Sequence, residues 1–323
     1  MHRGPLYADD YRPQLSGHET FPLRYGWLKK AFDAVQESES CLETKSIFLS
    51  EDAGARFGIG KNMVSSMRHW ASVTDVIRDT SREGRIVTEA TNFGCLLFDD
   101  ESGFDPYMED PTTLWVLHWK LSSRPQKTTW FWAFNYYPAT YFGRDQLVNG
   151  LCRLAKDRSW SRASITTIRN DVACFVRTYV RQSIRKHGSY EDSLESPLAE
   201  LGLIKSNGKR DNFQFVRGRK RTLGAGVFCW AVTEFWSKFS LEAQTLSLES
   251  LMYAPGSPGR VFLLDENDMV GRLAKIEETS KGLYRWSESA GLKQLTRTCD
   301  LDIEKAQRFI KIDYRRKGRS GAV

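Results

Sequence analysis

The sequence predicts an α+β protein that is mainly α-helical, with short β-hairpins and two units of the winged-helix or helix-turn-helix kind. Two observations lead to this class. Segments with helical apolar spacing are interrupted at glycine turns, and short alternating segments with polar turns follow them. The 323 residues include 10 Trp, 12 Tyr and 18 Phe, which is enough apolar surface for two or three cores.

The stretch 49–70 carries the clearest pattern of the chain. A short helix, a turn at Gly58 and Gly60, and a second helix beginning at Lys61 are expected there. In a helix-turn-helix, the start of the second helix faces the DNA major groove. Lys61, Asn62 and Arg68 would then face outward, although an ordinary helical hairpin would show the same pattern. A nucleotide-binding phosphate loop is excluded, since Ala55 and Asn62 replace residues which that motif requires.

The segment after this pair of helices has the pattern of a β-hairpin. Residues 79–85 are expected at its tip, and Ile86–Ala90 follows as a strand. Arg82 and Arg85 would lie on this wing, within reach of DNA phosphates, or they would belong to a solvated turn.

Ahead of these elements, Gly17–Phe21 leads into a helix predicted to begin at Thr20, with Pro22 in its first turn. His18 and Glu19 precede this helix. The pair could act as acid and base or help to hold a divalent metal ion. The alternative is structural, with Glu19 near a positive helix end and His18 hydrogen-bonded locally.

The middle of the chain is dense in aromatic residues. Leu114–Leu121 and Thr128–Tyr137 are predicted as helices, and core packing explains them better than base stacking does. A second helix-turn-helix-like unit is predicted near 159–179, where Ser164 caps a helix that presents Arg169. A solvated helix face would explain that arginine nearly as well.

Residues 205–216 are predicted to form a turn and a strand, and the strongest basic cluster of the chain follows them. Cations around a glycine at a hairpin tip would form a phosphate clamp, whereas a solvated loop is the alternative. The cluster consists of Arg217, Arg219, Lys220 and Arg221.

The C-terminal part begins near Ser247 and contains a predicted strand, Val261–Leu264, followed by a helix. Asp265, Glu266 and Asp268 stand at the start of that helix. Capping explains them, because carboxylates are favourable at a helix N-terminus. They could also bind Mg²⁺, since hard cations prefer oxygen ligands.

These patterns divide the chain into an irregular arm, 1–16, and three larger parts. Residues 17–102 form the predicted N-terminal winged-helix-like DNA-binding domain. Residues 103–246 form the aromatic-rich helical region with the second helix-turn-helix-like unit and the basic hairpin. Residues 247–323 form an α/β segment with a basic tail.

The net charge of +7 and the pI of about 9.0 favour a polyanionic partner, nucleic acid first. Simple solubility is the alternative. The six cysteines are spread out without a Cys-x-x-Cys pair, so neither zinc nor an iron–sulfur cluster is expected. Reduced thiols and the lack of an apolar signal or membrane-spanning run predict a cytoplasmic protein without a membrane partner.

Four segments, in matching order over nearly the whole chain, resemble an SspB-like family, a domain of unknown function found in bacterial DNA phosphorothioation operons. The segments are Gly17–Phe21 with Arg24, Gly58–Val64 with Arg68, Leu114–Trp119 with Trp130–Asn135, and Ser257–Phe262 with 290–292.

The resemblance implies a nickase of a phage-defence system, which cuts one DNA strand so that sulfur can enter the backbone. Its partners would be a cysteine desulfurase, an ATPase and an ATP pyrophosphatase-like sulfur-transfer component, and a homodimer is possible. We expect a centre at His18, Glu19 and Arg24, with Mg²⁺ or Mn²⁺ held by Asp265, Glu266 and Asp268. A non-catalytic DNA-binding adaptor and a winged-helix transcription regulator are the competing hypotheses, because the residues themselves show no established nuclease motif.

Overall fold

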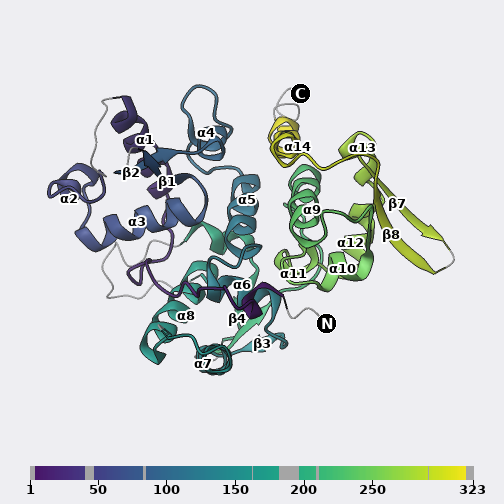
Figure 1. Cartoon of the computed structure of the whole chain (residues 1–323), viewed down its shortest axis with the longest axis horizontal. Coiled ribbons are helices and arrows are strands. Elements are labelled where there is room, and N and C mark those ends of the chain that lie inside the picture. Colours follow the sequence, from purple (N-terminus) through teal and green to yellow (C-terminus); the bar gives the residue numbers. More distant parts are fainter. Residues whose placement is uncertain are drawn as a thin grey trace.

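The computed structural model describes residues 4–40, 47–82, 85–161, 163–181, 196–208, 211–289 and 291–317. Helices predominate and the sheets are small and antiparallel, which confirms the predicted α+β class. The central helix α5 lies between an N-terminal group of elements and a C-terminal group, with a middle group beneath it (Figure 1). No helix within the described ranges combines the length and the apolar character needed to cross a membrane.

The N-terminal group follows a single-turn helix, η1 (Pro5–Tyr7), and a long irregular segment. The helix predicted from Thr20 begins only at Trp27, so that prediction is wrong: Glu19 and Thr20 have positive φ values of 45° and 66°, which no helix contains. The elements are α1 (Trp27–Ser40), α2 (Ala53–Phe57), α3 (Lys61–Val73), β1 (Ile77–Arg82), β2 (Arg85–Ala90) and α4 (Asn92–Phe98).

The middle group holds a three-stranded sheet in the order β3-β5-β4, in which the first strand pairs with the last. The prediction that Ser164 caps a helix is confirmed, since its hydroxyl accepts a hydrogen bond from the Thr167 amide. The elements are α5 (Pro111–Ser122), α6 (Thr128–Asn135), β3 (Tyr141–Phe142), α7 (Arg144–Asp157), α8 (Ile165–Tyr179), η3 (Pro197–Leu201), β4 (Ile204–Ser206) and β5 (Phe213–Phe215).

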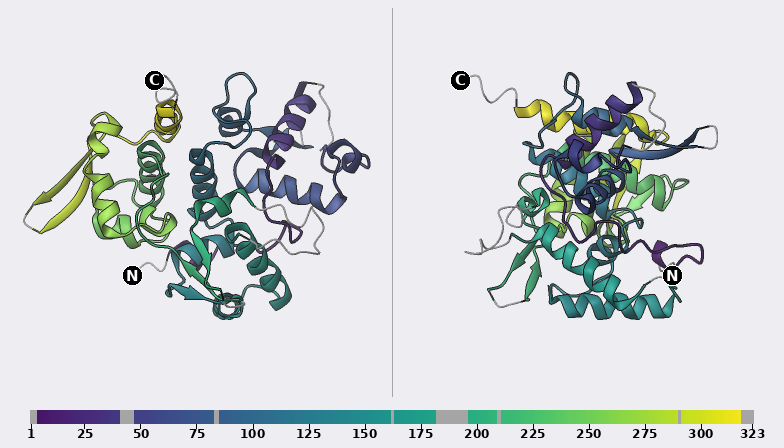
Figure 2. Two further views of the ribbon diagram at one scale, coloured as in Figure 1. Left: turned by 180° about the vertical axis from the view of Figure 1, so that it is seen from behind. Right: turned by 90° about the vertical axis from the view of Figure 1, so that its left-hand side faces the viewer.

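The C-terminal group repeats this connectivity in a sheet of order β6-β8-β7, whose long hairpin projects from the edge of the molecule (Figures 1 and 2). Its elements are α9 (Ala225–Phe239), β6 (Thr245–Ser247), α10 (Leu248–Tyr253), α11 (Pro258–Val261), α12 (Glu266–Leu273), α13 (Ile276–Ser280), β7 (Tyr284–Ser289), β8 (Leu292–Arg297) and α14 (Ile303–Lys317).

The segment Val261–Leu264 is not the strand that its apolar run predicted. Ser257 caps the short helix α11, Pro258 occupies its first turn, and the four apolar residues are completely buried around its end. A short apolar run is ambiguous between helix and strand, and here tertiary packing placed it at the end of a helix and in the turn that follows.

The aromatic helices α5 and α6 are buried in the core, as predicted, and they join the groups. Trp115, Trp119 and Trp130 are at most 1% exposed. His118 of α5 donates from Nε2 to the Val261 carbonyl at 2.8 Å, and its Nδ1 lies 2.8 Å from the Tyr179 hydroxyl. Burial lowers the pKa of His118 to about 3, so the ring is neutral.

Candidate nucleic-acid interface

In the helix-turn-helix pattern of residues 53–73, two glycines lie between the helices: Gly58 ends the first helix, and Gly60 precedes the second. Gly58 closes α2 at a φ of 66°, a conformation that glycine adopts without strain. Gly60 precedes α3, so Lys61 and Asn62 occupy its first turn and are exposed. Trp70 and other apolar residues of α3 are buried on the opposite face, as their spacing predicted.

Arg68 and Arg82 are both tied to the hairpin β1-β2. The half-buried Arg68 makes an ion pair of 2.8 Å with Asp79 of β1. Arg82 is 70% exposed at its side chain and lies 2.5 Å from Glu89 of β2. Arg85 pairs in register with Arg82, but its side chain and the predicted tip residues Glu83 and Gly84 lie outside the described residues.

A buried ionic cluster lies behind this unit and joins it to the middle group. Asp171 of α8 is fully buried, and its Oδ1 accepts hydrogen bonds from His18 Nε2 at 2.7 Å and from Lys127 Nζ at 2.9 Å. The Nδ1 atom of His18 accepts from the Thr20 amide at 3.0 Å. Both ring nitrogens of His18 are therefore engaged, and the hydrogen bonds select the neutral ring with its proton on Nε2. We call His18, Lys127 and Asp171 the buried cluster.

The charges of the buried cluster compensate each other. Burial alone would raise the pKa of Asp171, but Lys127 and the hydrogen bond from His18 lower it to about 2. Lys127 also lies over the ring of Trp130, 4.8 Å from its centroid. Burial and the nearby Lys127 lower the pKa of His69. The His69 ring also packs against Gly17, where an added Cβ atom would lie only 2.4 Å from the Nδ1 atom of His69.

The predicted catalytic residues His18, Glu19 and Arg24 differ in their exposure to solvent. His18 is buried, whereas Glu19 is exposed on the same turn. Arg24 is 6% exposed and stacks between the rings of Phe21 and Trp27. Of the three residues, Glu19 is the one that this turn exposes to solvent.

The second predicted unit presents a polar surface along α8. Arg169 and Asn170 are exposed, whereas the next residue, Asp171, points into the buried cluster. Arg177 donates to the carbonyl of Thr20 at 3.1 Å, so α8 also holds the turn that carries Glu19. Sequence reasoning missed Asp171 and Lys127, because a carboxylate and an ammonium far apart in the chain carry no local signal of their pairing.

The strongest basic cluster was predicted to lie at a hairpin tip, and that prediction is wrong. The tip lies between β4 and β5, while the cations follow β5 in a loop that packs on the C-terminal group. Lys220 is buried and donates to the Val216 carbonyl at 2.6 Å, and burial lowers its pKa to about 8. The remaining cations of the cluster are exposed: Arg217, Arg219 and Arg221.

The three carboxylates predicted to bind magnesium have separate partners. Asp265 caps α12 by accepting from the Asp268 amide at 2.8 Å, and Glu266 makes an ion pair with Lys293 at 3.0 Å. Asp268 accepts from Arg272 at 3.2 Å and from the Lys220 backbone amide at 3.1 Å. Within the described ranges, no group of three or more His, Cys, Asp or Glu is placed to hold a metal ion. The carboxylates as arranged therefore do not fit a magnesium site.

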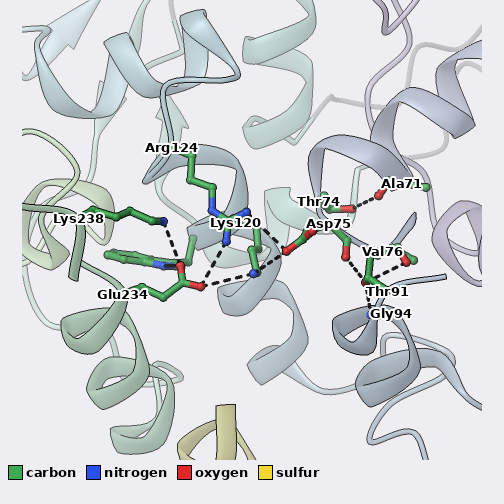
Figure 3. Close-up of polar contacts among 11 residues, drawn as sticks. Ala71, Thr74, Asp75, Val76, Thr91, Gly94, Lys120, Arg124, Glu234 and Lys238 are labelled. Atoms are coloured by element: carbon green, nitrogen blue, oxygen red, sulfur yellow. Dashed lines mark hydrogen bonds and ion pairs between the residues drawn. The ribbon is translucent and has the colours of Figure 1, made fainter. Parts of the chain in front are cut away.

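A second buried ionic network connects all the groups through α5, as Figure 3 shows. Lys120 of α5 is 3% exposed and lies 2.9 Å from Asp75, just after α3, and 3.5 Å from Glu234 of α9. Arg124 makes ion pairs with the same two carboxylates. Burial would raise the pKa of Glu234, but the surrounding cations lower it to about 2. This network fixes the N-terminal unit relative to the C-terminal group.

The family model described as a protein of unknown function, DUF4007, matches residues 15–314. The chain is similar to a magnesium ion-bound SspB crystal structure at 30% identity and a TM-score of 0.81, covering 93% of this chain and 87% of that one. A second SspB crystal structure matches at 29% identity and a TM-score of 0.79, with the same coverage. Among curated proteins, none matches the chain.

Proposed function

Since the chain belongs to the DUF4007 family as an SspB-like protein, we propose that it serves a bacterial DNA phosphorothioation system of phage defence. It binds DNA and nicks one strand, so that sulfur can be incorporated into the backbone. Its proposed partners are the cysteine desulfurase, the ATPase and the ATP pyrophosphatase-like sulfur-transfer component of that system. The observation that carries this proposal is the 30% identity to SspB over 93% of the chain.

The arrangement of the elements supports DNA binding. In the N-terminal group, α2, a glycine turn, α3 and the hairpin β1-β2 follow one another in the order of a winged helix. The middle group has the sequence α6, β3, α7, α8, β4, β5, with β3 paired to β5, which is the strand connectivity of the same module. The C-terminal sheet shares this connectivity, although sequence reasoning had suggested only two such units.

The exposed cations of these units are the proposed DNA contacts. Lys61 and Asn62 at the start of α3 enter a groove, while exposed arginines of the other elements neutralise phosphates. Arg68 and Lys220 hold the surfaces in place through Asp79 and Val216. The proposed phosphate contacts are the exposed Arg82, Arg169, Arg217, Arg219 and Arg221, together with Arg85, whose side chain lies outside the described residues.

Nicking is hydrolysis of one phosphodiester bond: water attacks phosphorus, the bond to one ester oxygen breaks, and that oxygen takes up a proton. Glu19 is the proposed general base, because it is the exposed carboxylate of the Gly17–Phe21 turn. His18 and Arg24 position this turn. A bound divalent cation such as Mg²⁺ would stabilise charge on the phosphoryl oxygens, but the described carboxylates assign it no ligands.

Relaxation of supercoiled plasmid with Mg²⁺ or Mn²⁺ tests the proposal. We expect open-circle product from the unmodified protein and loss of it in Glu19→Gln, with DNA binding retained. Glu242→Gln is the matched control, because Glu242 is also exposed but lies in the C-terminal group. Nicking that survives Glu19→Gln would leave the nickase in place and overturn Glu19 as its base.

A non-catalytic DNA-binding adaptor is the second candidate. It is favoured by the burial of His18 and by the separate pairing of Asp265, Glu266 and Asp268. DNA binding without nicking, either alone or with the sulfur-transfer components added, would decide for the adaptor. A strong sequence preference in a gel shift would favour a transcription regulator instead.

A further inference from the structure

The segment Ser257–Arg260 is a rigid platform with one side chain that reaches its surface. Ser257 is fully buried, and its hydroxyl accepts from the Arg260 amide at 3.3 Å. Gly259 is buried so closely that a Cβ atom would lie 2.6 Å from the Met252 backbone. Pro258 is buried as well, whereas Arg260 is half-buried. Because the other three residues form the support, the segment presents the Arg260 guanidinium.

The basic loop that carries Arg217 is joined to this platform by backbone hydrogen bonds. The Gly218 amide donates to the Leu263 carbonyl at 3.0 Å, and the Leu263 amide donates to the Arg260 carbonyl at 3.3 Å. The Lys220 amide donates to Asp268 on the following helix at 3.1 Å. These bonds bring Arg217 of the middle group and Arg260 of the C-terminal group to the same surface.

Arg217 and Arg260 lie on these two adjoining segments, which backbone hydrogen bonds hold together. Arg260 donates from Nε to the neutral Tyr253 carbonyl at 3.3 Å, and Tyr253 is 54% exposed. Within the described ranges, neither arginine makes an ion pair with an acidic side chain. Desolvation and the nearby charge of Arg260 lower the pKa of Arg217, and desolvation lowers that of Arg260. Two cations on adjoining segments, neither paired with an acidic side chain, favour the binding of an anion between them.

We propose that Arg217 and Arg260 together bind one backbone phosphate of DNA across the junction between the middle and C-terminal groups. Guanidinium groups suit this ligand because their paired donors match two phosphate oxygens. This inference rests on the proposed DNA binding and deepens it, since it assigns a role to Arg260 in a segment that the mechanism above does not use. It also makes the C-terminal group a part of the DNA-binding surface.

Fluorescence anisotropy of a short labelled duplex, titrated at several salt concentrations, tests the pair. We expect Arg217→Gln and Arg260→Gln each to weaken binding about tenfold. Each should also lower the slope of log affinity against log salt by about one, as loss of one phosphate contact does. Arg260→Lys should keep the slope and lose part of the affinity, since it retains the charge without the paired donors. Lys275→Gln is the matched control, because it removes an equally exposed charge elsewhere in the C-terminal group.

Thermal unfolding of the same variants separates binding from a structural role. Because the two charges repel each other, Arg217→Gln should not lower the midpoint, whereas a structural arginine would lower it. If both variants bind like the unmodified protein while Lys61→Gln binds more weakly, the phosphate site is overturned and the proposed DNA binding stands. If the unmodified protein binds no DNA at any salt concentration, both proposals fail. If Arg260→Gln does not fold, Arg217→Gln and Arg260→Lys decide the question.

Discussion

The buried cluster around Asp171 and the arginine pair at the C-terminal group differ in whether their charged side chains have oppositely charged partners. In the cluster, a carboxylate is enclosed by Lys127 and His18, and every charge has a partner. In the proposed arginine pair, Arg217 and Arg260 lie on adjoining segments, and among the described residues Arg260 donates to a neutral carbonyl rather than to a carboxylate. The degree of pairing therefore separates a charge that holds the fold from a charge that is available to a ligand.

Removal of the Asp171 charge should give the largest effect on stability. Asp171→Asn leaves Lys127 buried without its counterion, and we expect a loss of about 3–5 kcal/mol in the free energy of unfolding. Urea unfolding followed by circular dichroism measures this loss. Asp145→Asn, which changes an exposed aspartate in α7, should cost little. A loss below about 1 kcal/mol in Asp171→Asn would show that the cluster is not a structural ion pair.

Acid should weaken the buried cluster in a defined window. The pKa of Asp171 is about 2 in the folded protein, below its ordinary value of 3.8, so its stabilising effect is complete above pH 4. That effect is lost as the pH falls from about 4 to 2, and it amounts to about 2.5 kcal/mol. Urea midpoints of the unmodified protein should therefore fall more steeply over this window than those of Asp171→Asn. Parallel curves would contradict the pairing.

The network around Glu234 should be the more tolerant of the two buried networks. Glu234→Gln removes one carboxylate from Lys120, but Asp75 remains 2.9 Å away. We therefore expect a loss of about 2 kcal/mol in the free energy of unfolding. Glu242→Gln, in an exposed position, serves as the control in the same urea experiment. A loss as large as that of Asp171→Asn would show that Asp75 does not compensate Lys120.

The smallest expected change in the free energy of unfolding comes from backbone strain at Thr20, in the turn that the buried cluster holds. Thr20 has a φ of 66°, which is unfavourable for a β-branched residue. Thr20→Gly should raise the free energy of unfolding by about 0.5–1 kcal/mol, because glycine adopts this conformation freely. Thr166→Gly within helix α8 should lower it by about the same amount. A loss of stability in Thr20→Gly would mean that the contacts of the Thr20 side chain outweigh the strain.

Local patterns predicted the elements that depend on neighbouring residues. The turn at Gly58, the exposure of Lys61 and Asn62, and the cap at Ser164 all follow from side chains within a few positions of one another. Local patterns failed where contacts with distant residues decided: Val261–Leu264 was predicted as a strand, and Thr20 was predicted as a helix cap.

The sequence by itself determined the α+β class, the family and the exposed cations of α3, because spacing and composition express them directly. Only the tertiary structure decided that His18 and Lys127 both bind Asp171, and that the loop of Arg217 is bonded to the segment of Arg260. Those partners lie far apart in the chain. The same residue type is structural or available to a ligand according to the charges that the fold places beside it.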